Sequence, residues 1–364
     1  MSINSAVFVV YLLLLCFIQW GYSVERTVSV DVGVDGTVDA DIIDGFGIMR
    51  YDDGEFYEGE WKDGKWHGKG FHNLVNGDVY EGYFVEGLRQ GHGEYRYKSG
   101  HIFEGEYFDD VRNGRGIFQH KNGEVYEDDY VEDEPVGDNV VYKYVNGDVY
   151  EGHFKDNKKH GQGKLTLADG SYYIGNFVKD KKHGKGKFVI ANPKNDEGYE
   201  GDFEDDLRHG EGKFRFVNGD YYEGDYFRDR LHGTGKFIFA SGEIYEGEFV
   251  DGKMSGKGKL SIGSGDPFSG PDIYEGEFFN NKRNGYGVIN FAQGDRFEGH
   301  LVDDKLHGFG KHRFVTGDVY EGEFVQNLRQ GHGTYKLADG TVVYDGEWKD
   351  DNNVEPLKPI LRKG

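Results

Sequence analysis

Residues Tyr57 to Val79 read Tyr-Glu-Gly-Glu-Trp-Lys-Asp-Gly-Lys-Trp-His-Gly-Lys-Gly-Phe-His-Asn-Leu-Val-Asn-Gly-Asp-Val, and a variant of the same 23 residues begins at once at Tyr80. Similar sequences that recur with a fixed period of 20 to 50 residues are typical of repeat arrays, in which each repeat packs only against its neighbours. The period therefore predicts a repeat fold. It also provides a test for function, because a residue that recurs in every repeat is first of all a structural residue.

Twelve full repeats follow one another from Tyr57 onward. A partial repeat, Gly45 to Phe56, precedes them, and a thirteenth begins at Tyr344 and stops after Asp351. The full repeats start at Tyr57, Tyr80, Phe103, Tyr126, Tyr150, Tyr173, Tyr199, Tyr222, Tyr245, Tyr274, Phe297 and Tyr320. We therefore expect one array over residues 45–351.

The first five residues of each repeat alternate in character. Positions 1, 3 and 5 hold an aromatic residue, Gly and a second aromatic residue, as in Tyr57, Gly59 and Trp61, whereas positions 2 and 4 are usually acidic. Position 1 is Tyr or Phe in all thirteen repeats, and position 5 is aromatic in all but one, which has Leu301. A period of two places successive side chains on opposite faces of a β-strand. We expect one face to carry the rings, with Gly between them because a side chain there would crowd them.

A second strand is predicted in the rest of each repeat. Gly-x-Gly, such as Gly68-Lys69-Gly70, precedes another alternating stretch, such as Phe214 and Phe216. The repeat closes with a pair ending in Gly, which predicts a two-residue hairpin turn whose central residues both have positive φ. These pairs include Asn76-Gly77, Asn122-Gly123, Asp169-Gly170, Asn218-Gly219 and Asp339-Gly340. The sequence thus predicts an all-β chain in which every strand pairs with its sequence neighbours.

The pattern Tyr-Glu-Gly-Glu-Trp-x-x-Gly-Lys-x-His-Gly-x-Gly resembles the MORN repeat (membrane occupation and recognition nexus) from about Gly45 to Asp351. The resemblance implies a single-layer, twisted antiparallel sheet of stacked β-hairpins. At about 4.8 Å per strand, such a solenoid would be an elongated twisted rod of order 120 Å. The family's name implies membrane association, and self-association is common among its members.

Three repeats depart from the pattern. The repeat at Tyr126 has Asp128 where Gly is expected and Pro135-Val136 in place of a charged corner, and insertions occur around Asn192 to Gly198 and over Gly263 to Ile273. Insertions in repeat arrays lie in loops on one face or edge, where partners often bind. Tolerated variation in loop length is the alternative interpretation.

The charge of the chain is strongly negative but unevenly distributed. A formal net charge of −23 argues against nucleic acid, and against anionic lipid as a partner of the whole surface. From Tyr150 to Gly198, however, ten Lys stand against six Asp and Glu. Seven lysines of this stretch are expected to cluster on one edge, either as a site for anionic lipid head groups or as ordinary solvated corners. They are Lys158, Lys159, Lys179, Lys181, Lys182, Lys185 and Lys187.

The amino-terminal segment predicts entry into the secretory route. Ala6 to Ile18 is an apolar run too short to span a bilayer but of the length of a signal-peptide core, with cleavage expected after Ser23. No Lys or Arg precedes the run, so an uncleaved signal anchor or a mistaken start codon is the alternative. The resemblance to the MORN repeat implies a cytoplasmic or cytoskeletal location instead. Residues 24–44 form an acidic lead-in, either an edge strand or a flexible segment, and residues 352–364 a tail.

No motif predicts an enzyme, a cofactor or a metal site. The single cysteine is Cys16, and no phosphate-binding loop, Gly-x-Ser-x-Gly or His-Glu-x-x-His occurs. Six histidines share position 11, but Gln, Asn or Ser replaces them in other repeats, which indicates hydrogen bonding at the hairpin corner and not metal binding. The histidines are His67, His160, His183, His209, His232 and His307. The carboxylates at positions 2 and 4 recur in nearly every repeat, as on a solvated face.

The leading hypothesis is a non-catalytic scaffold that binds proteins, including a second copy of itself, through its ring-lined face and open ends. The rings expected to bind partners are Tyr57, Trp61, Tyr80, Phe84, Tyr199, Phe203, Tyr245 and Phe249. The rival hypothesis is a peripheral membrane module that binds phosphoinositides through the seven lysines or is held at the membrane by an uncleaved leader.

Overall fold

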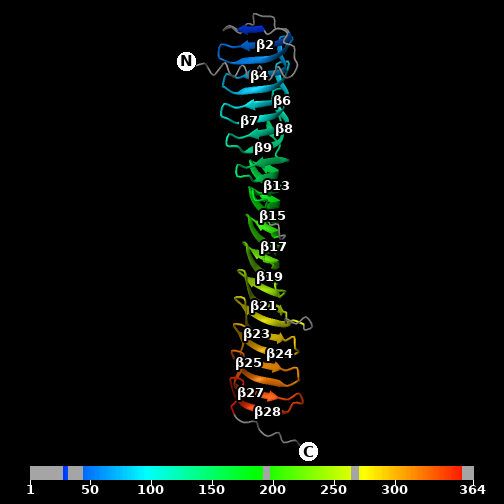
Figure 1. Cartoon of the computed structure of the whole chain (residues 1–364), viewed down its shortest axis with the longest axis vertical. Helices are drawn as coiled ribbons and strands as arrows, with labels where there is room; N and C mark the ends of the chain where they lie inside the picture. The colour runs from blue at the N-terminus through cyan, green and yellow to red at the C-terminus, as the bar shows by residue number, and fades with distance from the viewer. Residues whose placement is uncertain (1–27, 32–43, 192–196, 264–269, 355–364) are drawn as a thin grey trace, which may run out of the picture. The chain divides into compact units, whose positions relative to one another are not determined.

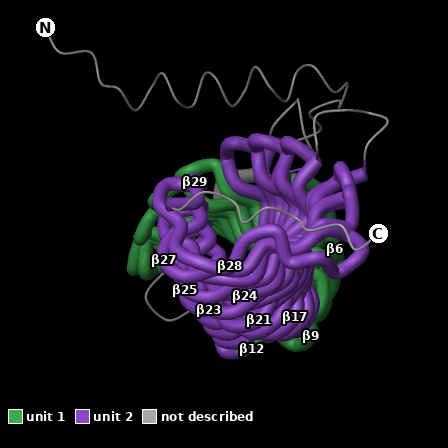
Figure 2. Tube along the Cα trace, turned by 90° about the horizontal axis from the view of Figure 1, so that it is seen from below, with its two compact units in different colours: residues 1–155 green, residues 156–364 purple. Residues whose placement is uncertain are grey.

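The computed structural model describes residues 28–31, 44–191, 197–263 and 270–354, which form β-strands and no helix. The chain divides into two compact units, residues 1–155 (unit 1) and 156–364 (unit 2) (Figure 2). In each unit successive hairpins stack in an open antiparallel sheet (Figure 1), which confirms the predicted all-β fold. The predicted leader, most of the lead-in and residues 355–364 of the tail lie outside the described residues.

Unit 1 begins with a parallel pair of strands, in which Val28 to Asp31 lie beside Gly47 to Arg50. A strand is thus present within the acidic lead-in. The strands of unit 1 are β1 (Val28–Asp31), β2 (Asp44–Arg50), β3 (Phe56–Lys62), β4 (Lys65–Asn73), β5 (Val79–Val85), β6 (Leu88–Arg96), β7 (Ile102–Phe108), β8 (Val111–Gln119), β9 (Val125–Val131), β10 (Glu134–Pro135), β11 (Val140–Lys143) and β12 (Val149–Lys155).

Unit 2 continues the same alternation of a shorter and a longer strand. Its strands are β13 (Lys158–Thr166), β14 (Tyr172–Val178), β15 (Lys181–Val189), β16 (Gly198–Glu204), β17 (Leu207–Arg215), β18 (Tyr221–Phe227), β19 (Arg230–Ile238), β20 (Ile244–Val250), β21 (Lys253–Ile262), β22 (Asp272–Phe279), β23 (Lys282–Asn290), β24 (Arg296–Val302), β25 (Lys305–Arg313), β26 (Val319–Val325), β27 (Leu328–Lys336), β28 (Val342–Lys349) and β29 (Asn352–Asn353).

A ladder of glycines crosses each unit. In unit 2 the glycine at position 3 of one strand lies opposite the second glycine of Gly-x-Gly on the next, as in Gly201 and Gly212, and such pairs continue from Gly163 on β13 to Gly346 on β28. A Cβ on Gly201 would lie 2.5 Å from the Glu211 carbonyl oxygen. The ladder therefore lets strands and rings approach more closely than any side chain would allow.

The first glycine of Gly-x-Gly has a different role. After the Gly201–Gly212 pair the register jumps, so that Asp202 lies opposite His209, and Gly210 occupies the resulting bulge at φ +56°. Glycine adopts this left-handed conformation without the steric cost of a Cβ. The bulge explains why the second strand of most hairpins is the longer one.

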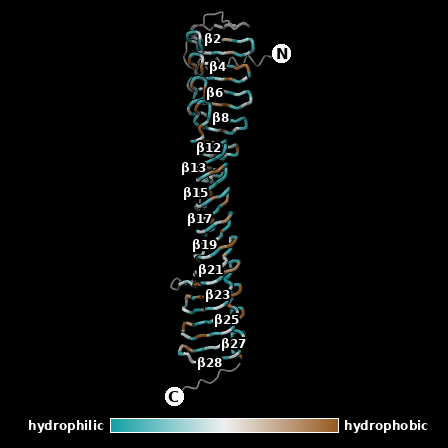
Figure 3. The backbone as a smooth tube through the Cα atoms, turned by 180° about the vertical axis from the view of Figure 1, so that it is seen from behind, coloured by the Kyte–Doolittle hydropathy of each residue, from teal (hydrophilic) through white to brown (hydrophobic). Residues whose placement is uncertain are grey.

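The rings at positions 1 and 5 form the core of each unit. Tyr199 meets Phe203 of its own strand and Tyr226 of the next repeat edge to face, with ring centroids 5.0 and 5.2 Å apart. The Arg208 guanidinium lies 5.8 Å from the Tyr199 ring centroid and 5.2 Å from that of Tyr226. Neighbouring repeats and this cation therefore cover rings that a single layer of sheet would otherwise leave open. Figure 3 shows the hydrophobic residues recurring in successive hairpins of each unit.

The expectation that these rings lie on an uncovered face is therefore wrong. The predicted partner-binding rings are buried, with Tyr57 0% exposed and Trp61, the most exposed of the eight, only 6% exposed. The eight are Tyr57, Trp61, Tyr80, Phe84, Tyr199, Phe203, Tyr245 and Phe249. A partner could reach them only if a hairpin opened.

Most position-1 tyrosines also donate a hydrogen bond to the backbone. The Tyr222 hydroxyl donates to the Asp225 carbonyl oxygen at 2.9 Å, and Tyr245 and Tyr274 make the same bond three residues along their strands. Burial raises the pKa of several of these hydroxyls, to about 12 for Tyr80 and for Tyr173. The neutral phenol is therefore the form that the fold stabilises.

We expect this burial to cause cooperative unfolding in alkali. Burial raises the pKa of Tyr80 and Tyr173 in the folded chain to about 12, above the ordinary tyrosine value of 10.0, so the unfolded chain releases protons first as the pH rises. The stabilisation is complete below about pH 10 and is lost as the pH rises through the folded pKa. Tyrosinate absorbance and far-ultraviolet circular dichroism followed together should change in one transition. Full tyrosinate absorbance with the sheet signal intact would contradict this expectation.

The structure places the two-residue turns at the other corner of the hairpin from the one predicted. The Asn-Gly corner is a three-residue loop, in which Gly77 N–H donates to the Leu74 carbonyl at 2.9 Å and only Gly77, not Asn76, has positive φ. The prediction of a two-residue turn there is wrong. Two-residue turns with positive φ at both residues occur at the opposite corner, at positions 7 and 8, as in Asp205-Asp206 and Asp251-Gly252.

Aspartates at position 8 tie one hairpin to the next. The Asp229 carboxylate accepts hydrogen bonds from Arg208 N–H and Nε, both at 3.0 Å, and Asp229 N–H donates to the Arg208 carbonyl at 2.9 Å. Arg89, Arg112, Arg283 and Arg329 make the same set of bonds in other repeats. Many of the acidic residues thus serve as backbone caps, which accounts for part of the negative charge.

Asp229→Ala should destabilise unit 2 by about 1–2 kcal/mol, because Arg208 N–H loses its acceptor and alanine must adopt a φ of 69°. Asp229→Asn is the matched control, since Asn281 and Asn327 occupy position 8 in other repeats and accept the equivalent bond. Urea unfolding with hydrogen exchange at Arg208 measures both effects. Equal stability of the two variants would show that the side-chain acceptor at position 8 contributes nothing.

Candidate interaction surface

The even positions of each first strand form a solvent-exposed face opposite the rings, which we call the outer face. Side chains at positions 2, 4 and 6 lie on it, together with the residue between the two glycines, position 13. At position 4, Glu60, Asp202, Asp225 and Glu248 accept a hydrogen bond from the position-13 backbone N–H of the same hairpin. Many side chains of the outer face therefore serve the fold. A binding surface must consist of side chains that do not make such bonds.

An alternating charge ladder occupies one row of the outer face in unit 2. Lys187, Glu200, Lys213, Glu223, Lys236, Glu246, Lys259 and Glu275 lie opposite one another on the successive strands β15 to β22. The Lys213–Glu223 pair is 3.1 Å apart, and this hydrogen bond holds the pKa of the Glu223 carboxyl below its ordinary value. Exposed pairs of this kind contribute little to stability, because solvent screens them.

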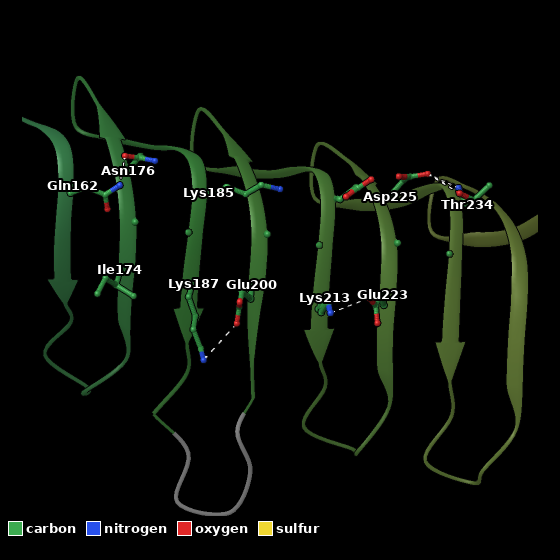
Figure 4. A pocket seen from close by; sticks show the side chains of 17 residues that line it. Gln162, Ile174, Asn176, Lys185, Lys187, Glu200, Lys213, Glu223, Asp225 and Thr234 are labelled. Atoms are coloured by element: carbon green, nitrogen blue, oxygen red, sulfur yellow. Dashed lines mark hydrogen bonds and ion pairs between the residues drawn. The ribbon is translucent and has the colours of Figure 1, made fainter.

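A shallow groove of about 880 Å³ runs along this row (Figure 4). Its floor is the backbone of the glycine ladder, and its walls carry both charges, including Lys187 paired with Glu200 and Lys213 paired with Glu223. Lysines and carboxylates that already pair with each other give the groove no marked preference for an anionic or a cationic ligand.

An apolar row follows position 6 in each unit. In most repeats this position holds an exposed Val or Phe, although Lys62, Lys155, Glu204 and Lys349 occupy it elsewhere. The apolar row consists of Val85, Phe108 and Val131 in unit 1 and of Val178, Phe227, Val250, Phe279, Val302 and Val325 in unit 2. This row was not predicted from the sequence, although the Val or Phe that follows the second ring in most repeats was the available signal.

The structure separates the seven lysines that were expected to share one edge. Lys185 and Lys187 lie on the outer face in the middle of β15 (Figure 4), where they pair with Asp202 and Glu200. Lys182 lies on the ring face, 5.7 Å from the ring centroid of Tyr173. Lys158, Lys179 and Lys181 are exposed at or beside the corners, and Lys159 is half-buried. The predicted single cluster is wrong, because alternation and the Gly-x-Gly bulge send neighbouring lysines to different faces.

The position-11 residues make different contacts in different repeats. The side-chain oxygens of Gln90 and Gln330 each accept a hydrogen bond from a backbone N–H at the corner of the next repeat, at 2.9 and 3.0 Å. Hydrogen bonding at the corner was predicted for this position. The Nδ1 atoms of His183, His209 and His232 are buried without a hydrogen bond, and Glu204 lies 3.2 Å from His209 Nδ1 out of bonding alignment. Among the described residues no group of His, Cys, Asp and Glu could hold a metal ion.

The irregular repeat at Tyr126 is built around a buried carboxylate. Asp128, 0% exposed, takes the place of the ladder glycine opposite Gly116. It accepts hydrogen bonds from the Tyr126 hydroxyl and Gly137 N–H, both at 2.7 Å, and from Asp129 N–H at 2.8 Å. These bonds satisfy the carboxylate internally, so it offers little to a ligand. Residues 192–196 and 264–269 of the two insertions lie outside the described residues.

Comparisons with known proteins identify the repeat and no close relative. None of the curated proteins matches the chain. Solved structures match weakly: the TCP10 domain of Danio rerio CPAP (12% identity, 76% of this chain and 99% of that one, TM-score 0.22) and the SAS-4 TCP domain of Drosophila melanogaster in complex with a proline-rich motif of Ana2 (11%, 59% and 95%, TM-score 0.25). TM-scores this low carry no conclusion about fold or function.

A family model for the MORN repeat matches residues 35–56, 57–79, 80–102, 103–125, 150–172, 173–192, 199–221, 222–244, 245–266, 274–296, 297–319 and 320–342. The gap at 126–149 coincides with the irregular repeat of Asp128. No helix in the described ranges is long and apolar enough to cross a membrane. The MORN repeat is a non-enzymatic module for protein or membrane interaction, and no catalytic family is indicated. With matches over most of its length, the chain belongs to the MORN repeat family.

Proposed function

We propose that this chain is a non-catalytic scaffold that binds proteins through its outer face. The observation that carries the proposal is the apolar row, which leaves Val and Phe side chains exposed at the same position of successive repeats. Exposed apolar side chains that recur along one face, here with Lys or Arg of the paired strand between them, mark a candidate interaction site. The buried rings are not available for this role, so we place the binding surface on the outer face and not on the ring face.

Self-association is one form of this function. A second copy could cover the apolar row, and the outer edge of β28 pairs with only the two residues of β29 in the described part of the chain. Static light scattering of the full chain over a range of concentrations tests this form. A constant monomer mass would exclude it and leave other protein partners.

Binding to anionic lipid through basic corners is the second candidate function, and it has less support. Lys181 lies 3.7 Å from Asp205 at its corner, and the lysines do not form one patch. Flotation with phosphoinositide vesicles, with and without Lys158→Glu and Lys181→Glu, tests it directly. Salt-sensitive flotation that these changes abolish would favour the membrane module over the scaffold.

The scaffold proposal is tested with Val250→Lys/Phe279→Lys in the full chain. Lys62 and Lys349 hold the same position in other repeats, so the fold should tolerate both changes. We expect proteins cross-linked to the wild-type chain in cells to be lost from this variant, while Lys236→Gln, a change in the charge ladder, retains them. An unchanged set of cross-linked proteins, with an unchanged melting temperature, would refute the apolar row as the binding surface.

A further inference from the structure

Two neighbouring repeats of unit 2 carry aromatic side chains where the array otherwise has polar ones. Position 13 holds Tyr286 on β23 and Phe309 on β25, which are 46% and 59% exposed. In the other nine full repeats with Gly-x-Gly, this position is Lys, His, Arg, Gln, Glu or Thr. The two rings are therefore not required by the repeat, and on a solvent-exposed face they bury no core.

The two rings belong to one row across the sheet. Tyr286 lies directly opposite His300 of β24, with ring centroids 5.5 Å apart, and Phe309 lies opposite Glu323 of β26. Glu277 covers the bulge glycine next to Tyr286 at the other end. In strand order from β22 to β26, the row consists of Glu277, Tyr286, His300, Phe309 and Glu323. It crosses five strands and spans roughly 19 Å at about 4.8 Å per strand.

The terminal carboxylates of this row are not used by the fold. At the same position, Glu60, Asp202 and Glu248 accept the backbone N–H of the bulge. Glu277 and Glu323 are exposed, and within the described residues their carboxylates take part in no hydrogen bond or ion pair. An acceptor that makes no internal bond and stands beside an exposed ring is suited to a cationic side chain.

Other exposed rings of the outer face show what such a ring attracts. The Lys69 ammonium lies 5.6 Å from the ring centroid of Tyr83, and the Arg228 guanidinium 5.7 Å from that of Phe227. No cation of the described chain lies over Tyr286 or Phe309. A cation over an aromatic face contributes favourable electrostatic energy, which increases when the pair is desolvated.

We propose that the outer face of β22–β26 binds a basic peptide segment of a partner protein. Arginine or lysine side chains of the segment stack on Tyr286 and Phe309. The same cations pair with Glu277 and Glu323 at the two ends of the row. The proposal rests on the scaffold function proposed above and names the chemistry of one partner at one site.

The distance between the two rings determines how far apart the arginines of a test peptide should be. Tyr286 and Phe309 are two strands apart, about 9.6 Å, and three residues of an extended peptide span roughly 10 Å. We would use a fluorescein-labelled, acetylated and amidated peptide of three Arg-Gly-Ser units, and the Glu-Gly-Ser peptide as its control. Anisotropy titrations with the full chain at low and high salt give the affinity of each.

The wild-type chain should bind the arginine peptide in a saturable, salt-sensitive manner and should not bind the glutamate peptide. Tyr286→Gln/Phe309→Thr should weaken binding about fivefold or more. Gln162 and Thr234 hold position 13 in other repeats, so this variant should fold. Glu277→Gln/Glu323→Gln should weaken binding and reduce its salt dependence. Gln162→Thr, at the same position on β13 and without a change of charge, is the matched control and should bind as the wild type does.

Three results would overturn the proposal. The first is no saturable binding of the arginine peptide, or equal affinity for the wild type and Tyr286→Gln/Phe309→Thr. The second is a wild-type dimer that this variant converts to a monomer, which would make the row an interface between copies. The third is tighter peptide binding after charge reversal of Lys358, Arg362 and Lys363, which would assign the row to the chain's own tail. All three leave the separate test of the apolar row intact.

Discussion

Gly201→Ala is expected to unfold the hairpin of β16 and β17 at a urea concentration at which the wild-type chain is still folded. The added Cβ would lie 2.5 Å from both the Glu211 carbonyl oxygen and Gly212 Cα, and 2.6 Å from the Tyr199 hydroxyl. Two of these atoms belong to the backbone of the paired strand, which cannot move away without breaking the ladder. Overpacking typically costs about 1–3 kcal/mol, and we expect the upper end of this range here.

Hydrogen exchange is the measurement that suits a repeat array. Because each repeat contacts only its neighbours, the damage should spread from β16 and β17 and weaken with distance. Gly263→Ala is the control, because a Cβ there would meet nothing within 4 Å. Equal exchange protection in the two variants would show that the glycine ladder is not required for close packing.

Asp128→Ala should destabilise unit 1 strongly. It removes the acceptor of the Tyr126 hydroxyl and of Gly137 N–H, both 2.7 Å away, and leaves these donors buried without partners. Each such loss costs about 1–3 kcal/mol, so a total of about 3–5 kcal/mol is expected. Urea unfolding with hydrogen exchange over β9 to β11 measures it.

Two further variants at this site separate the carboxylate from the rest of the irregular repeat. Tyr126→Phe removes one hydrogen bond and no packing, and should cost about 1 kcal/mol. Asp128→Gly restores the ladder residue found in most other repeats but still leaves the Gly137 amide without its acceptor. If Asp128→Gly is as stable as the wild type, the carboxylate does not hold this repeat together.

The sequence was sufficient for the fold because its signals are local and repeated. Alternation predicted the strands, and a period of 23 residues predicted pairing between sequence neighbours. The reading of position 11 as a structural position agrees with the glutamine contacts at Gln90 and Gln330. The turn prediction failed because Asn-Gly suits two hairpin geometries, and only the backbone shows that Asn76 has negative φ.

The candidate interaction surface could not be predicted from the sequence, for a different reason. Alternation shows which side chains share a face, but not which face the neighbouring repeats and their cations cover. Tyr199 and Phe227 are both aromatic, yet the first lies beneath Arg208 and the rings of its neighbours, and the second is exposed. The rings were expected to bind partners because a single-layer sheet was assumed to leave one face uncovered.

The sequence by itself thus determined the repeat, the strand pairing and the rings at positions 1 and 5, since these depend on residue type and period alone. The tertiary structure decided that the rings are core, that the seven lysines lie on different faces and that Tyr286 and Phe309 stand exposed beside Glu277 and Glu323. Burial, ion pairing and exposure depend on what the adjacent repeat places against a side chain, and that is fixed only when the hairpins stack.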